Sequence, residues 1–159
     1  MKNKNMTIIK RAVFAVFLSV LFTSVNAVNY RVPKMYMFGF AASFNDSIVH
    51  FTSVQTVDSV WIDQKTKLMA GRENYSYQLR DYLATKNMPH RTCVVFYNLD
   101  RKKIEKKYLQ MKRIYTLGTK KARKQIKKGG KINHYDIRNL TSDEFKFHSV
   151  DMSGAVYDE

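Results

Sequence analysis

Residues 92–131 read TCVVFYNLDRKKIEKKYLQMKRIYTLGTKKARKQIKKGGK. The first six residues are rich in β-branched and aromatic side chains, a composition typical of a buried strand. A turn at Asn98–Asp100 follows, and the chain then combines apolar residues at helical spacing with a dense run of lysine and arginine. This order predicts a strand and a helix that pack into the core, and a basic segment that carries most of the charge.

The helix has the clearest local signals. Asp100 can accept hydrogen bonds from the first free N–H groups, and Leu99 and Ile104 have the spacing of a hydrophobic staple. Gly118 interrupts the helical pattern, so residues 119–131 are interpreted as a second helix, as an interrupted extension of the first helix, or as a loop. A stripe of apolar residues is predicted to face the core, and it consists of Ile104, Tyr108, Met111 and Tyr115.

Positive charge is concentrated in one part of the chain. The formal net charge is +15, and residues 101–131 contain fourteen lysine or arginine residues and one acid, Glu105. Such a segment can neutralise nucleic acid, an anionic lipid or glycolipid, or an acidic protein surface. The alternative is a solvated lysine-rich loop that keeps the protein soluble. The candidate anion-binding residues are Lys120, Lys121, Arg123, Lys124, Lys127 and Lys128.

Residues 1–27 have the pattern of a secretory signal peptide. Four basic residues precede an apolar block at 12–22. Val25 and Ala27 are the small residues of a cleavage site. The apolar block is shorter than the roughly 20 residues that span a membrane, so no membrane span is expected after cleavage. We therefore predict a bacterial protein that is exported to the periplasm or outside the cell.

The single cysteine, Cys93, lies within the predicted strand and cannot form a disulfide inside the chain. We interpret it as a buried small hydrophobe, and its spacing from His90 places the two side chains on opposite strand faces. No histidine has a spacing typical of a metal site, and no nucleophile-elbow, P-loop or dinucleotide motif occurs. No catalytic residue, metal ligand or cofactor is therefore assigned. The other histidines are His50, His134 and His148.

The first half of the chain predicts a hairpin. Residues 34–42 and 48–54 are apolar and β-branched, and they flank a turn at 43–47, while residues 28–33 are expected to be a flexible lead-in. Residues 55–62 either extend the sheet or form a loop that carries Trp61 to the core. A short helix is expected from Asp63, as its cap, through Met69.

The second half predicts two further elements beside the strand–helix unit. A helix from Asn74 ends at Asn87 and Pro89, residues 91–97 form the central strand, and the alternation at 144–150 indicates a half-exposed strand. We thus predict an α+β fold in the order β-β-α-β-α-β, within one domain at 28–152 that a frayed tail at 153–159 follows. The first helix is expected to bury Tyr75, Leu79, Tyr82 and Leu83.

The succession of hairpin, helix, strand and a helix with a glutamate resembles the GIY-YIG nuclease domain. In that family a tyrosine on each hairpin strand, an arginine and a glutamate surround a divalent metal and the scissile phosphate. The resemblance implies a metal-dependent nuclease in which histidine replaces the second tyrosine. The residues that it implies are Tyr36, His50, Arg72 or Arg80, and Glu105.

The leading interpretation is an exported binding module for an anionic partner, with its oligomeric state open. The chain as a whole resembles small exported proteins of envelope-bearing bacteria, a resemblance that implies export and no particular activity. A third alternative is a structural envelope protein without a ligand, whose apolar hairpin pairs with a strand of a partner.

Overall fold

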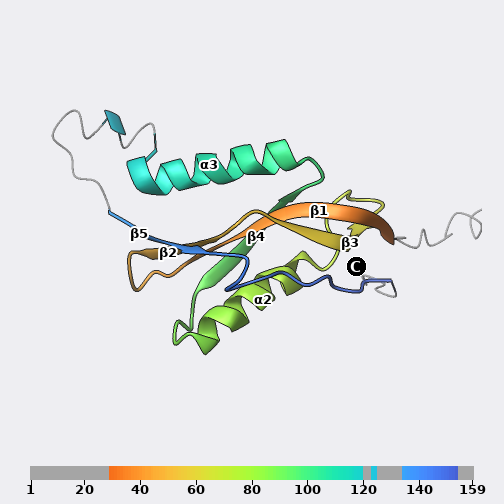
Figure 1. Ribbon diagram of the computed structural model, residues 1–159, viewed down its shortest axis with the longest axis horizontal. Helices are drawn as coiled ribbons and strands as arrows, with labels where there is room; N and C mark the ends of the chain where they lie inside the picture. Colours follow the sequence, from red (N-terminus) through yellow and green to blue (C-terminus); the bar gives the residue numbers. More distant parts are fainter. Residues whose placement is uncertain (1–28, 120–122, 125–133, 154–159) are drawn as a thin grey trace, which may run out of the picture. The chain divides into compact units, whose positions relative to one another are not determined.

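A five-stranded mixed sheet lies between two helices in the computed structural model, which describes residues 29–119, 123–124 and 134–153. One helix covers each face of the sheet (Figure 1). The predicted α+β class with two helices packed on a small sheet is confirmed, with one strand more than the predicted order. The elements are β1 (Asn29–Ala42), β2 (Ile48–Thr52), β3 (Gln55–Asp63), α2 (Arg72–Thr85), β4 (Thr92–Asn98), α3 (Arg101–Leu117) and β5 (Asp136–Leu140).

Strand β1 is the centre of the sheet. Its last residues pair antiparallel with β2, and the rest of the strand pairs antiparallel with β3. On its opposite side β1 pairs antiparallel with β4, from Tyr36↔Asn98 to Ala42↔Thr92. Strand β5 then adds in parallel to β2. The predicted hairpin is confirmed, and residues 55–62 extend the sheet.

Residues 91–97 do not form the predicted central strand, because β4 pairs with β1 alone among the described strands. The reason is the length of β1, which is 14 residues and therefore accommodates β2 and β3 one after the other along one side. The predicted flexible lead-in is also wrong from Asn29 onward. The ladder between β1 and β3 passes over Pro33 and Ser59, and Ser59 has a φ of 61°. This irregularity interrupts the alternation of buried and exposed residues, so the sequence pattern does not indicate the full strand.

The expected helix from Asp63 to Met69 is a turn instead. The Asp63 carboxylate accepts a hydrogen bond from the Thr66 N–H, and Lys67 adopts a φ of 60°, a left-handed conformation that a helix cannot continue through. The chain then doubles back, and Met69 pairs antiparallel with Ile62 in an isolated bridge. Asp63 thus bonds to a following N–H group as a helix cap would, but here the bond closes a turn.

Residues 144–150 alternate as predicted but form no strand. Phe145 and Phe147 are buried, Lys146, His148 and Ser149 are exposed, and Val150 is partly buried. The backbone of this segment bonds to side chains: the Gln55 Nε2 donates to the Phe145 carbonyl at 2.8 Å, and the Phe147 N–H donates to the Gln55 Oε1 at 2.9 Å. Residues 136–140 occupy the free edge of β2, so the later segment runs beside α2 (Figure 1).

The sheet separates two hydrophobic cores. The α2 side contains Leu79 and Leu83, and the α3 side contains Phe38, Phe51 and Ile104. Close packing on the α2 side needs a glycine, because a Cβ at Gly39 would lie 2.6 Å from Leu79 Cδ2. The predicted buried face of α2 is confirmed for Tyr75, Leu79 and Leu83, while Tyr82 is partly buried.

Residues 1–28 and 154–159 lie outside the described residues, and with them the predicted signal peptide and most of the predicted tail. Within the described residues, neither helix is long and apolar enough to cross a membrane.

Candidate anion-binding face of helix α3

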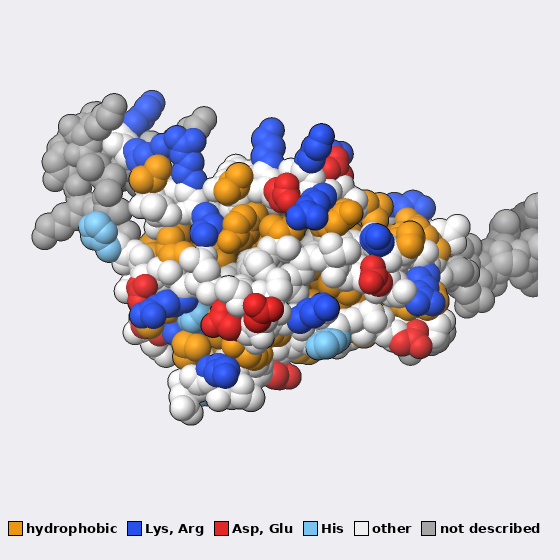
Figure 2. Space-filling view, in the orientation of Figure 1, with side chains coloured by type: hydrophobic (Ala, Val, Ile, Leu, Met, Phe, Trp, Pro, Cys, Tyr) orange, Lys and Arg blue, Asp and Glu red, His pale blue; other side chains and the backbone are white. Residues whose placement is uncertain are grey.

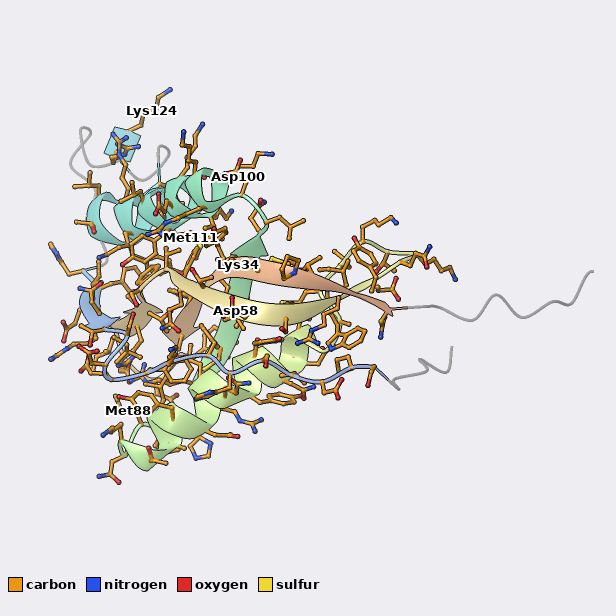
Figure 3. The ribbon with its side chains drawn as sticks, turned by 45° about the vertical axis from the view of Figure 1, so that its right-hand side comes forward. Lys34, Asp58, Met88, Asp100, Met111 and Lys124 are labelled. Carbon is orange, nitrogen blue, oxygen red and sulfur yellow. The ribbon has the colours of Figure 1, made fainter. Side chains whose placement is uncertain are left out.

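The rotation of α3 about its axis is set by its packing on the sheet. The predicted cap is confirmed, because the Asp100 carboxylate accepts hydrogen bonds from the N–H groups of Lys102 and Lys103. Tyr108 packs edge-on against Phe38, with 5.2 Å between ring centroids. Figure 3 shows Met111 reaching from the helix toward the sheet and Asp100 at the helix start. The predicted stripe therefore faces the core, and the remaining positions face outward.

Leu99 does not occupy the buried position that a staple on Ile104 would give it. Its side chain is 56 % exposed and lines a shallow cleft with Tyr30 and Tyr97. The helix start is therefore held by the Asp100 cap and by Ile104, which is buried.

Seven lysine or arginine side chains project from α3, and the fold provides partners for three of them. Arg101 forms an ion pair with Glu105 at 2.8 Å. The Lys107 ammonium lies 5.5 Å from the Phe96 ring centroid, and the Lys112 ammonium lies 5.2 Å from that of Tyr108. The other four are exposed and have no side-chain partner among the described residues: Lys102, Lys103, Lys106 and Arg113.

The basic residues near the start of α3 lower the stability of this helix. The N-terminal end of a helix carries a partial positive charge, which the Asp100 cap compensates, but the first turn of α3 itself has no acid and contains Lys102 and Lys103. Lys102 and Lys106 are like charges one turn apart, and so are Lys103 and Lys107. The cations of α3 therefore do not add to the stability of the helix, apart from Arg101 in its pair with Glu105.

The opposite face of the sheet has no comparable excess of positive charge. Helix α2 has two basic and two acidic residues, and the segment at 141–153 has three acids and one lysine, Lys146. Figure 2 shows blue side chains gathered over α3, whereas blue and red alternate on the part of the surface below it. Among the described residues, the excess of positive charge is thus greatest on α3.

Only two of the six predicted anion-binding residues, Arg123 and Lys124, lie within the described residues. The Arg123 N–H donates to the Thr119 carbonyl at 2.9 Å, and Lys124 points away from the sheet (Figure 3). Helix α3 ends at Leu117, and Gly118 has φ 74° and ψ 169°, so the stripe does not continue without a break. Lys120, Lys121, Lys127 and Lys128 lie outside the described residues.

The exposed cations of α3 lie within the predicted basic segment at 101–131, but they were not among the six residues singled out for anion binding. Three of them lie on the helix face opposite the apolar stripe: Lys102, Lys106 and Arg113. Their helical spacing can be recognised from the sequence alone.

The residues implied by the nuclease resemblance are divided between the two faces of the sheet. Tyr36 packs with the core on the α3 side, and Glu105 is on α3, where it pairs with Arg101. His50 is in register with Ala41, which belongs to the core on the α2 side. The alternatives Arg72 and Arg80 are both on α2. The described residues also contain no group of three or more histidine, cysteine or acidic side chains that could hold a metal ion.

A buried polar group lies at the turn between β1 and β2. The Arg91 guanidinium bonds to the Asp46 carboxylate at 2.7 Å and to the Ile48 carbonyl at 2.9 Å. His50 is 2 % exposed, and its Nδ1 has no hydrogen-bond partner among the described residues. Burial lowers the pKa of His50, and the positive charge of Arg91 acts in the same direction. Burial and the lowered pKa both favour the neutral form of His50 at neutral pH.

Cys93 is partly buried in β4, and burial raises the pKa of its thiol to about 11. A thiol with such a pKa stays protonated at neutral pH and is a poor nucleophile. This fits the interpretation of Cys93 as a small hydrophobe. His90 is exposed and has a φ of 62°, so it is part of the turn before β4.

We expect stability to fall in mildly acidic solution because of His50. Its folded-state pKa lies below the unfolded value of about 6.5, so the unfolded chain binds the proton more tightly. The free energy of unfolding should therefore decrease as the pH falls below about 6.5. Urea unfolding at pH 7.5 and 5.5 measures this difference.

The matched variants are His50→Gln, which should reduce the pH dependence, and His148→Gln on the exposed segment, which should retain it. Both pH values lie above the range in which a carboxylate such as Asp46 titrates. An equal loss of stability on acidification in all three proteins would contradict the assignment to His50.

Comparison with protein-family models, with curated proteins and with solved structures finds no match to this chain. The function is therefore inferred from the geometry of the chain alone.

Proposed function

We propose that this protein is an exported binding module for an anionic partner and that α3 forms part of its binding face. One observation carries the proposal: four exposed cations without a side-chain partner project from a helix whose rotation is set by the core. The basic segment after Gly118 adds further positive charge to the same part of the sequence. Export follows from the signal-peptide pattern of residues 1–27 and would deliver this face to partners in the bacterial envelope or beyond.

The exposed cations of α3 favour a partner that supplies negative charge next to them. Exposed cations that repel one another and oppose the helix dipole are stabilised when an anion lies between them. A surface of one sign also accelerates encounter with a partner of the other sign, and salt weakens this effect because the Debye length is about 8 Å at physiological ionic strength. Binding should therefore be strong at low salt and weak at high salt. Nucleic acid, anionic lipid and acidic protein all meet this requirement.

The change Lys102→Glu is expected to have opposite effects on stability and on binding. It places an acid at the N-terminal end of α3 and creates a Glu–Lys pair with Lys106, a gain of about 0.5–1 kcal/mol in the free energy of unfolding. The same change should lower the salt concentration at which the protein elutes from heparin resin. Urea unfolding and heparin chromatography measure the two effects.

Lys146→Glu is the matched control, because it changes the net charge by the same amount. Lys146 lies in the segment at 141–153, on the α2 side of the sheet. Its elution should stay close to that of the unchanged protein. Failure of the unchanged protein to bind heparin, anionic vesicles and DNA at low salt would overturn the proposal. Equal shifts for the two variants would show that net charge, and not α3, governs binding.

A further inference from the structure

Strand β4 has one backbone edge with which no other described strand pairs. Among the described residues it forms a ladder with β1 alone, which runs without a break over seven pairs from Ala42↔Thr92 to Tyr36↔Asn98. In an antiparallel strand, alternate residues direct their N–H and C=O groups to the side away from the partner. Those groups of β4 are therefore available for a further strand.

Among the described residues, three strands lie at an edge of the sheet, β3, β4 and β5, and they differ in how they are protected. Strand β3 has Asp58 and the left-handed Ser59 in its middle, and its residue Ile62 pairs with Met69. Strand β5 is 5 residues long and has an exposed ion pair between Arg138 and Asp136, a type of edge that resists further pairing. Strand β4 is 7 residues long, with the sequence TCVVFYN, and contains no charged residue and no proline. An unprotected apolar edge of this length is a surface that accepts another strand.

The side chains beside this edge are apolar, with cations above them. Val94 is 42 % exposed, and Phe96 packs with the core on the α3 side. The Lys107 ammonium lies over the Phe96 ring, and Lys103 is one helical turn before Lys107 on the same flank of α3. An added strand would thus cover Val94, and its side chains on that side would face Lys107.

Charge decides which strand fits this edge. Pairing β4 with β4 of a second copy in an antiparallel arrangement would place the two α3 helices on the same face of the extended sheet. Each α3 carries seven basic residues and one acid, so the two helices would repel each other. A strand with acidic side chains on the α3 side instead gives charge complementarity with Lys103 and Lys107.

We infer that the free edge of β4 binds an extended acidic segment of a partner protein by β-strand addition, with its acidic side chains against Lys103 and Lys107. This inference rests on the proposed function and specifies its partner. Backbone hydrogen bonds to β4 supply affinity, and the lysines on the flank of α3 select acidic over basic sequences.

The probe is an eight-residue peptide that alternates glutamate and valine, measured by fluorescence anisotropy at low salt. Two matched peptides accompany it, one that alternates lysine and valine, and one that has the probe sequence with N-methyl groups on alternate residues. N-methylation keeps the charge and removes the donors along one edge. We expect the probe to bind, the lysine peptide not to bind, and the N-methylated peptide to bind at least about tenfold more weakly.

Two variants on the same helix test the geometry. Lys107→Glu should weaken binding of the probe about tenfold, as the loss of a charge-assisted contact predicts. Lys112→Glu changes the net charge equally, but Lys112 is on the opposite flank of α3, over Tyr108, and the effect should be smaller. Hydrogen exchange should show new protection of β4 amides when the probe is bound.

The outcomes separate this inference from the proposed function. Retained heparin binding with equal affinity for the methylated and unmethylated peptides would overturn strand addition and leave the anionic partner standing. Selective binding of DNA or anionic vesicles over the probe would likewise overturn it. The β4 amides that bond to β1 are protected already, so the test concerns the amides that face away from β1. Protection of these outward amides in the free protein would assign the edge to a second copy if the protein sediments as a dimer. It would assign the edge to another part of the same chain if the protein sediments as a monomer. Loss of all binding at low salt would overturn both proposals.

Discussion

Replacement of Phe38 by alanine is expected to lower the free energy of unfolding by about 3–5 kcal/mol. The Phe38 side chain is fully buried and packs against Phe96 at 5.1 Å and Tyr108 at 5.2 Å between ring centroids. Alanine would leave a cavity between the sheet and α3. Because small domains have about 5–15 kcal/mol of stability in total, urea unfolding should show a large decrease in midpoint.

Phe44→Ala is the matched control, because it removes the same atoms from the exposed turn between β1 and β2. Phe44 is 102 % exposed, and its loss should change stability by no more than about 0.5 kcal/mol. The Phe38 variant should also bind heparin less tightly if α3 loses its fixed orientation. Similar stabilities for the two variants would contradict the packing of α3 on Phe38.

Gln55→Leu is expected to destabilise the protein by about 2–4 kcal/mol, the second-largest effect. The Gln55 amide is buried and bonds to both the carbonyl of Phe145 and the N–H of Phe147. Leucine has a similar size but leaves both backbone groups buried without a partner. Hydrogen exchange at the Phe147 amide should accelerate, since that proton loses its acceptor.

Gln78 on α2 provides the control for the Gln55 prediction. Gln78 makes the same pair of bonds, to the carbonyl and the N–H of His148 at 2.9 Å each, but at an exposed position. Water can replace these bonds, so Gln78→Leu should cost less than about 1 kcal/mol. A Gln55 variant as stable as the Gln78 variant would show that water reaches the backbone at Phe145 and Phe147.

The elements that local signals specify were predictable. The cap at Asp100 and the apolar stripe from Ile104 to Tyr115 concern residues within a few turns of each other, and the structure agrees with both. The helix that buries Tyr75 and Leu79 was likewise evident from spacing. In each case the hydrogen bonds that form the element join residues that are close in sequence.

Elements that depend on pairing between distant residues were not predictable in the same way. Residues 136–140 and 144–150 are both extended and partly apolar, but only the first pairs with β2. The choice depends on which backbone edge is free and on a buried glutamine 90 residues away from Phe145. The place of β4 at an edge depends in the same way on the length of β1.

The candidate binding face of α3 was predictable from the sequence in part, and in part it depends on the tertiary structure. The excess of lysine and arginine after Asp100 can be counted in the sequence. The free cations are identified only by the structure, because Glu105, Phe96 and Tyr108 supply partners for the others. The separation of Tyr36 from His50 also depends on the sheet, since each strand directs its side chains to two faces.

The sequence by itself determined that this chain has an α+β core, a capped basic helix and a strong excess of positive charge beyond residue 100. Composition and periodicity are sufficient for these features because they depend on neighbouring residues. The tertiary structure alone decided which cations of α3 lack a side-chain partner and that, among the described residues, one edge of β4 is unpaired. The physical reason is that a strand edge and a helix face are free only in relation to what other parts of the chain already cover.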